Sequence, residues 1–277
     1  CKGERRMAEI GEFQGPYGRI AVRDSGGSKP AIVLLHGNSA SSRAFQRQFE
    51  GPLAEQFRVV AYDLSGHGQS ADAADEAGYR LTGHARTLVA LAEAMGLKDA
   101  VFGGWSLGGH IILEAAPDLP RARGFAIFGT PPIDLPPPPD AFLPIPALGV
   151  GFTPEITAEQ AQAYAEAGVA PDFADIPGFF VEDILRADGR ARAGIAASIA
   201  PGASRDEAKL VATLKTPLAV MHGERDQLIN LAYIKTLTMP SMWRGAVQVI
   251  PGAGHTPQWE TPAAFDALIG DFARDCG

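Results

Sequence analysis

The sequence predicts an α/β protein with a mostly parallel central sheet, helices on both faces of the sheet and an inserted helical cap. Three observations favour this fold class. Short apolar runs alternate with helix-like segments, as in sheets with crossover helices. Several of these runs are apolar on both faces, which is typical of buried parallel strands. The alternation stops between about Pro131 and Leu214, a stretch far longer than an ordinary connection in such a sheet.

Seven runs are predicted as strands because they are short, rich in apolar or β-branched residues and bounded by turn residues. They are Arg19–Arg23, Ala31–Leu35, Arg58–Tyr62, Ala100–Gly103, Gly124–Phe128, Leu218–Met221 and Ala246–Ile250. A helix is predicted over Thr82–Met95, where leucines recur at helical spacing before Gly96. The closing helix starts at Thr261, followed by proline at its first position.

The long break predicts a division into a core, residues 7–133 and 215–277, and a cap, residues 134–214. Proline runs, of which Pro136–Pro139 is the longest, predict a stiff and extended entry to the cap. Thr157–Ala167 and Asp206–Leu214 are predicted helices. The proline-rich entry fits a mobile surface loop equally well.

Composition excludes several classes of protein. The 277 residues are 46% hydrophobic and 20% charged with a net charge of −8, so we expect a globular protein without a nucleic-acid partner. No apolar stretch reaches the roughly twenty residues of a membrane span. The polar N-terminal residues do not resemble a secretory signal, and Met7 is a candidate first residue. Cys1 and Cys276 lie at the two ends and predict no disulfide framework. We expect a cytoplasmic protein; the oligomeric state is open.

A G-x-S-x-G pentapeptide, Gly104–Gly108, lies between a predicted strand and the helix-like segment Gly109–Ala115. In this context the glycines allow a sharp turn that presents the Ser106 hydroxyl at the carboxyl edge of a sheet. The pentapeptide alone is a weak signal. Three further positions at the ends of predicted strands supply the rest of a nucleophilic site.

His255 follows the last strand and Asp226 follows the strand before it. We expect Asp226 to hold one imidazole nitrogen of His255, so that the other nitrogen takes the Ser106 proton. Glu224 and Asp134 are alternative acids, because each also follows a predicted strand. The plainest alternative is that the glycines only allow close packing and Ser106 is inert.

The loop after the strand that ends at Leu35 carries His36, Gly37 and Asn38. We expect the backbone amides of Asn38 and Leu107 to form an oxyanion hole. His36 is expected to brace this loop. His67, His84 and His110 are expected to be hydrogen-bonded structural residues, and no histidine spacing of a metal-dependent hydrolase occurs, so neither a metal nor another cofactor is expected.

The chain resembles the α/β-hydrolase superfamily, in which the order serine, acid, histidine is the expected one. Within it, the chain resembles the serine-type N-acyl-homoserine lactonases, which open the ring of bacterial quorum-sensing signals. The matching segments are Gly18–Arg23, Leu35–Ser39, Gly104–Ile111, Gly129–Pro132, Asp188–Arg192 and Phe272–Cys276. Some of them lie outside the catalytic loops, so shared chemistry alone does not account for them.

The resemblance implies a small amphiphilic lactone or ester as substrate. It implies that Tyr164 and Asn38 help to hold this substrate, and Trp105 would offer apolar surface to an acyl chain; from the residues alone, Tyr164 is only part of an amphipathic helix. Two features depart from the relatives. The acid is Asp226 where they have Glu, and the run Pro136–Pro139 is unlike theirs, which leaves the preferred acyl length open.

Two other functions stay open from the sequence. One is a carboxylesterase acting on small acyclic esters. The other is a ligand-binding protein built on a hydrolase fold, since a fold does not fix an activity. Epoxide hydrolases and haloalkane dehalogenases are disfavoured, because they place Asp where this chain has Ser106.

Overall fold

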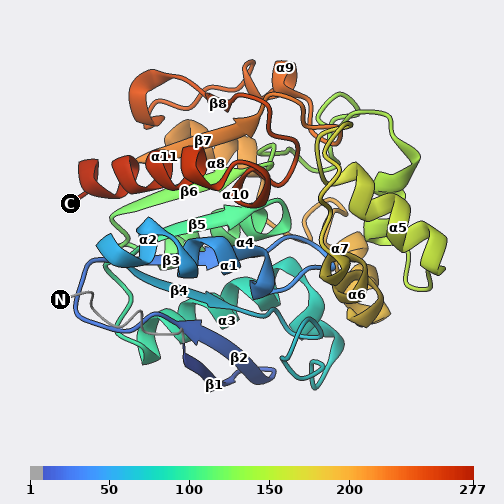
Figure 1. Cartoon of the computed structure of the whole chain (residues 1–277), viewed down its shortest axis with the longest axis horizontal. Helices are drawn as coiled ribbons and strands as arrows, with labels where there is room; N and C mark the ends of the chain where they lie inside the picture. The colour runs from blue at the N-terminus through green and yellow to red at the C-terminus, as the bar shows by residue number, and fades with distance from the viewer. Residues whose placement is uncertain (1–8) are drawn as a thin grey trace.

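The computed structural model describes residues 9–277; Cys1 and Met7 lie outside the described residues. Its centre is an eight-stranded twisted sheet with the order β1-β2-β4-β3-β5-β6-β7-β8 (Figure 1). The strands are β1 Glu9–Gly15, β2 Gly18–Asp24, β3 Ala31–Leu35, β4 Arg58–Tyr62, β5 Val101–Trp105, β6 Gly124–Phe128, β7 Leu218–Gly223 and β8 Gln248–Ile250.

Along this order, the six strands β4, β3, β5, β6, β7 and β8 pair with their neighbours in parallel. The pairs β1 with β2 and β2 with β4 are antiparallel. A mostly parallel sheet is therefore confirmed. The sequence does not predict β1, because this strand contains two glycines and exposes Ile10, so it has no apolar run. It forms through backbone pairing with β2 across the hairpin between Gly15 and Gly18. β8 is also shorter than predicted, since it begins only at Gln248.

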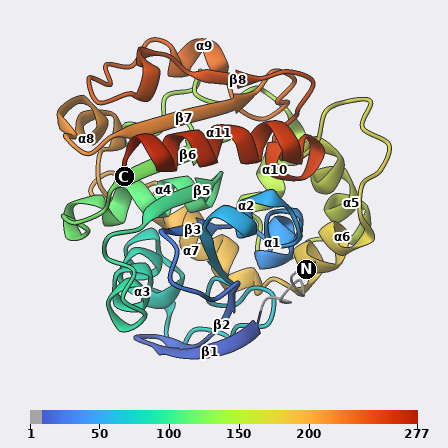
Figure 2. The same cartoon turned by 60° about the vertical axis from the view of Figure 1, so that its left-hand side comes forward.

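Helices cover both faces of the sheet (Figures 1 and 2). One apolar cluster joins the sheet to α3 Leu81–Ala94, α4 Leu107–Ala115 and α8 Glu207–Thr213. A second cluster on the other face joins it to α1 Gln46–Glu50, α2 Pro52–Gln56 and α11 Pro262–Asp275. The remaining short helices around the core are η1 Ser42–Phe45, η2 Glu76–Tyr79, η3 Ala116–Asp118, α9 Leu231–Ile234, η5 Trp243–Gly245 and α10 Pro257–Glu260.

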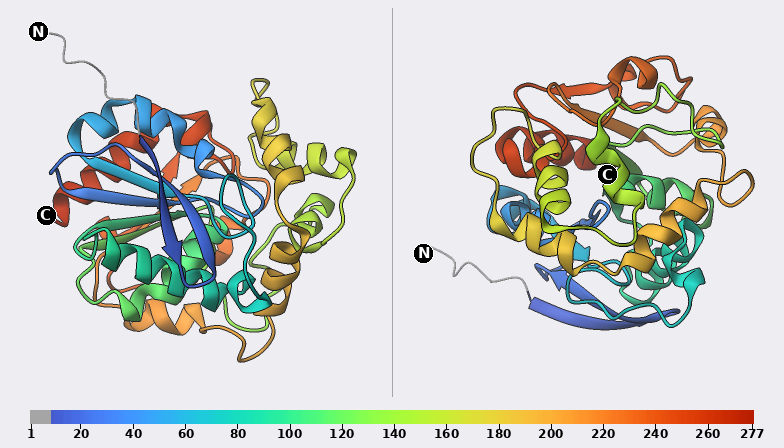
Figure 3. Two further views of the ribbon diagram at one scale, coloured as in Figure 1. Left: turned by 90° about the horizontal axis from the view of Figure 1, so that it is seen from below. Right: turned by 90° about the vertical axis from the view of Figure 1, so that its right-hand side faces the viewer.

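The segment between β6 and β7 supplies four helices that lie over one end of the sheet (Figure 3). They are η4 Pro146–Phe152, α5 Ala158–Ala167, α6 Gly178–Arg186 and α7 Gly189–Ser198. Thr157 caps α5 in a capping box with Gln160, so this predicted helix is confirmed. α8 follows them in the chain but packs against α4, with its Val211 in the core cluster. The cap boundaries at 134 and 214 stay a prediction.

Two buried charged side chains connect these helices to the core. Asp183 of α6 accepts hydrogen bonds from Ser41 Oγ, at 2.6 Å, and from the guanidinium of Arg43. Arg192 of α7 donates to Ser39 Oγ in the loop after β3.

A membrane-crossing helix, which has to be both long and apolar, does not occur between residues 9 and 277.

Candidate active site

Ser106 lies between β5 and α4 in a backbone conformation that non-glycine residues rarely adopt, with φ +52° and ψ −117°. Its backbone N–H donates to the Phe128 carbonyl at 2.9 Å, which fixes the turn to β6. The flanking glycines are required sterically: a Cβ at Gly104 would lie 2.4 Å from the backbone of Gly108. The strained turn therefore depends on the glycines of the pentapeptide.

The loops after β7 and β8 bring Asp226 to His255. The His255 Nδ1 and Asp226 Oδ2 atoms are 2.8 Å apart. The other carboxylate oxygen, Oδ1, accepts the backbone N–H groups of Leu228 at 2.8 Å and Ile229 at 3.1 Å. Burial alone would raise the pKa of Asp226, but the imidazole and these hydrogen bonds outweigh burial and hold the pKa below its ordinary value. The geometry favours an ionised Asp226.

The two alternative acids are directed elsewhere. Glu224 is exposed, and its Oε2 accepts the Gly252 N–H at 2.9 Å. Asp134 is also exposed and shares a hydrogen bond with Asp206, which raises the pKa of Asp134. Of the three candidate acids, Asp226 is the one whose carboxylate contacts His255.

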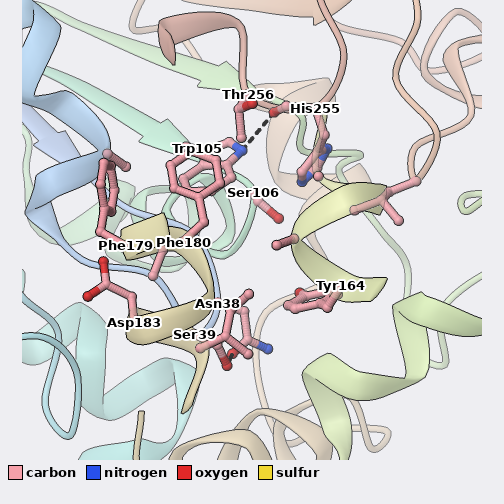
Figure 4. Close-up of a pocket in the computed structure, with 16 residues that line it drawn as sticks. Asn38, Ser39, Trp105, Ser106, Tyr164, Phe179, Phe180, Asp183, His255 and Thr256 are labelled. Atoms are coloured by element: carbon pink, nitrogen blue, oxygen red, sulfur yellow. Dashed lines mark hydrogen bonds between the residues drawn. The ribbon is translucent and has the colours of Figure 1, made fainter. Parts of the chain in front are cut away.

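The backbone on either side of His255 is held by two side chains. Trp105 Nε1 donates to the His255 carbonyl at 2.8 Å (Figure 4). Glu260 accepts the backbone N–H groups of Gly254, at 2.9 Å, and Thr256, at 3.1 Å. Glu260 was not predicted as a site residue, because it lies on the short helix α10 after β8 and belongs to no recognisable motif.

The loop after β3 places Asn38 beside Ser106 (Figure 4). Asn38 Nδ2 donates to the Gly151 carbonyl of η4 at 2.6 Å, and its Oδ1 accepts from Ser39 Oγ at 3.1 Å. Leu107 is the first residue of α4, so its N–H has no acceptor within the helix. Of the two amides proposed for the oxyanion hole, that of Leu107 thus follows the serine directly, and that of Asn38 comes from the loop after β3.

Three histidines pack behind this loop. The His36 Nδ1–H donates to the Gly37 carbonyl and Nε2 accepts the Leu64 N–H, so His36 braces the loop as expected. His67 Nε2 accepts from the backbone of the same loop. The expectation for His84 is wrong, because neither of its ring nitrogens has a hydrogen-bond partner. Burial lowers the pKa of His84 to about 3, so its ring is neutral.

Two adjoining hollows, which we call the two lobes of one cavity, share five lining residues: Asn38, Ser106, Tyr164, Leu228 and His255. Figure 4 shows the smaller lobe with Ser106 and His255 beside it. The smaller lobe, of about 40 Å³, is lined by aromatic side chains among others: Trp105, Phe179 and Phe180. The larger lobe, of about 240 Å³, is mostly apolar and includes Leu81, Phe142, Phe152 and Ile195. The residues that border both lobes mark the place where a substrate carbonyl would meet the serine.

Tyr164 projects from α5 toward this junction (Figure 4). Within residues 9–277 its hydroxyl has no hydrogen-bond partner, and burial raises its pKa to about 12. A Cβ at Gly151 would lie 2.9 Å from the Tyr164 hydroxyl and 3.1 Å from Asn38 Nδ2. Gly151, which the sequence analysis misses, therefore leaves the room that these two polar groups occupy.

In residues 9–277 no three His, Cys, Asp or Glu side chains gather in a way that could hold a metal ion. His110, expected to be a hydrogen-bonded structural residue, contacts Glu207 through Nδ1 and at the same time lines the larger lobe.

Known proteins resemble this chain over most of its length. The structure is similar to that of the N-acyl homoserine lactonase AidH complexed with N-butanoyl homoserine, with a TM-score of 0.93, 33% identity and 97% of each chain covered. A Ser-to-Gly mutant of AidH complexed with N-hexanoyl homoserine lactone gives the same TM-score and identity over 97% of this chain and 98% of that one.

Two curated proteins are more distant or match in part. The non-heme chloroperoxidase of Burkholderia pyrrocinia is 26% identical over 242 residues, 81% of this chain and 84% of that protein. The pimeloyl-[acyl-carrier protein] methyl ester esterase of Stenotrophomonas maltophilia is 39% identical over 106 residues, 38% of each chain. The model of the alpha/beta hydrolase family matches residues 32–268. With this match and the fold described above, the chain belongs to the alpha/beta hydrolase family.

Proposed function

We propose that this protein opens the lactone ring of N-acyl homoserine lactones by a Ser-His-Asp mechanism. The observation that carries the proposal is the similarity to AidH, which extends over the cap helices as well as the core. AidH is known in complex with N-butanoyl homoserine, and a Ser-to-Gly mutant of AidH in complex with N-hexanoyl homoserine lactone. The cap matters because its helices supply Tyr164, Phe179 and Phe180 to the walls around Ser106.

In the first half of the reaction, His255 Nε2 withdraws the Ser106 proton and the serine oxygen attacks the lactone carbonyl. Asp226 holds Nδ1–H at 2.8 Å, which fixes the tautomer with a basic Nε2 and stabilises the imidazolium that forms. Its second oxygen is held by two backbone amides, so the carboxylate keeps its direction during proton transfer. The shorter Asp in place of Glu thus fills the same role.

The negative charge that develops on the carbonyl oxygen requires donors. The backbone amides of Asn38 and Leu107 supply them, at about 3 kcal/mol for each donor in sites of this kind. The Tyr164 hydroxyl, which has no partner in residues 9–277, is placed to orient the same carbonyl. Because Gly151 holds the Asn38 side chain at 2.6 Å, η4 fixes the position of this loop.

In the second half, His255 donates its proton to the ring oxygen as the C–O bond breaks, and then activates a water that hydrolyses the acyl-enzyme. The released alcohol stays tethered to the acyl group and can close the ring again. Net hydrolysis therefore requires that the alcohol swings away from His255. The two lobes that meet at Ser106 give it a place to do so.

Kinetic comparison of substrates tests the proposal. The purified protein is given homoserine lactones of several acyl lengths and, in parallel, p-nitrophenyl esters of the same acids. We expect the value of kcat/KM to be larger for the lactones, with a mass gain of one water in each product. Turnover of the esters without opening of any lactone would reject the lactonase assignment.

A carboxylesterase for acyclic esters is the second candidate. It is favoured by the local 39% identity to a methyl ester esterase, which covers 38% of the chain. The same assay separates the two functions, because a p-nitrophenyl ester releases its alcohol into solvent, whereas an opened lactone retains its alcohol.

A further inference from the structure

His110 and Glu207 form a hydrogen-bonded pair in the wall of the larger lobe. Glu207 is only 1% exposed. Its oxygens lie 2.9 and 2.8 Å from His110 Nδ1, and Oε2 also accepts the Ile133 N–H at 3.1 Å. A carboxylate buried in an apolar wall is costly unless it is hydrogen-bonded in this way. These hydrogen bonds hold the pair in a fixed place in the wall. The reaction proposed above does not use it.

The Glu207 contact fixes which nitrogen of His110 is left free. A carboxylate only accepts, so Nδ1 donates to Glu207, and Nε2 is the ring nitrogen that remains. Within residues 9–277 no protein group bonds to this Nε2. The hydroxyls that line the same lobe are already engaged, since Ser198 Oγ donates to the Gly194 carbonyl and Ser204 Oγ to the Ser198 carbonyl. His110 thus offers an unbonded ring nitrogen to a molecule in the lobe.

The position of His110 relates this ring nitrogen to the reaction. His110 follows Ser106 by four residues in the first turn of α4, where its backbone N–H donates to the Ser106 carbonyl at 3.4 Å. Ser106 and His110 border the same lobe. A substrate whose carbonyl is at Ser106 would bring atoms several bonds further along its chain past the imidazole.

We propose that His110, held by Glu207, shares a hydrogen bond with a hydroxyl group on the acyl chain of the substrate. The protein then prefers N-acyl homoserine lactones that carry a hydroxyl near the amide over the unsubstituted ones. A hydroxyl can either donate to this ring nitrogen or accept from it. It costs free energy in an apolar pocket unless it finds a partner, and an unsubstituted chain leaves the ring nitrogen unpaired. This inference rests on the proposed function and adds the substrate class to it.

The test compares N-hexanoyl and N-(3-hydroxyhexanoyl) homoserine lactone with the wild-type protein and two variants. In the wild type, kcat/KM for the hydroxylated substrate exceeds that for the unsubstituted one on the order of 10-fold, the factor that corresponds to about 1.4 kcal/mol, within the net range of one hydrogen bond. In His110→Leu this ratio falls to about 1, because the ring nitrogen is lost. In His110→Gln the preference persists, since a carboxamide can both donate and accept in place of Nε2.

Two results would overturn the inference. One is a wild-type ratio at or below 1, which needs no variant and so does not depend on folding. The other is a fall in kcat/KM of His110→Leu that is equal for both substrates, which would mean that His110 contacts the amide or only supports the helix; circular dichroism checks that this variant is folded. Equal opening of both lactones refutes this inference alone, whereas no opening of either refutes the proposed function as well.

Discussion

Replacement of Arg192 by alanine should loosen the cap from the core. Arg192 is 3% exposed and its guanidinium donates to the carbonyls of Thr153 and Pro154, both at 2.7 Å. A longer bond of 3.3 Å reaches Ser39 Oγ, which in turn donates to Asn38 Oδ1. The side chain therefore joins α7, the segment after η4 and the loop proposed to hold the oxyanion.

The magnitude follows from the two short bonds. Hydrogen bonds from a charged donor are worth about 1.5 kcal/mol each at the low end, so their loss lowers the free energy of unfolding by about 3 kcal/mol. Arg190→Ala is the matched control: it lies on the same helix, removes the same charge, and its 58% exposed side chain pairs with Asp188 and Asp72 at the surface. This exposed side chain is worth no more than about 1 kcal/mol.

Urea denaturation of the two variants measures the difference, and lactone opening measures the functional consequence. We expect kcat/KM to fall in Arg192→Ala and to stay near the wild-type value in Arg190→Ala. Equal unfolding free energies for the two variants would refute the reasoning, because burial and the short carbonyl contacts would then carry no weight.

Three further predictions concern single residues. Asp226→Asn should lower kcat about 10³- to 10⁴-fold through loss of the correct imidazole tautomer, while Glu224→Gln should leave it unchanged; equal effects would reassign the acid. His84 stays neutral when folded, with a pKa of about 3, but binds a proton below about pH 6.5 when unfolded. Its contribution to stability is thus full above pH 6.5 and is lost as the pH falls toward 3, so from pH 7 to 5 urea titrations of His84→Leu should show roughly 2 kcal/mol less loss than the wild type; parallel curves would contradict this. Gly104→Ala should cost at least about 2 kcal/mol because its Cβ meets backbone, whereas Gly149→Ala, with open space around its Cβ, should cost little; a stable, active Gly104→Ala protein would disprove the steric argument.

The strands β3 to β7 could be predicted because each is a local apolar run that the fold buries almost throughout. β8 is short and exposes Val249, and its predicted start is two residues too early. β1 could not be predicted, since its pairing with β2 is made by backbone groups and its side chains are largely exposed. The cap helices α6 and α7 are short and begin after Pro177 and Asp188. α7 has little apolar periodicity, whereas α6 is strongly amphipathic and could have been predicted. Their place is set by buried contacts such as that of Asp183 with Ser41, 142 residues away.

The candidate site shows the same division. Ser106, Asp226 and His255 are recognisable because each lies in a short glycine-containing segment directly after a strand. Glu207 is not recognisable, because it lies 97 residues from its partner His110 and only the packing of α8 against α4 brings the two together. The expectation that His84 is hydrogen-bonded fails for a related reason: a polar residue on an apolar helix face can be buried without a partner, at a cost in stability.

The central claim is that Ser106 is the nucleophile of a lactone-opening reaction. The most direct measurement is the rate at which Ser106→Ala opens N-hexanoyl homoserine lactone, followed as the gain of one water by mass spectrometry and corrected for spontaneous hydrolysis. The proposed mechanism predicts a loss of at least about 10⁴-fold relative to the wild type, with the variant still folded. Opening at the wild-type rate would contradict it.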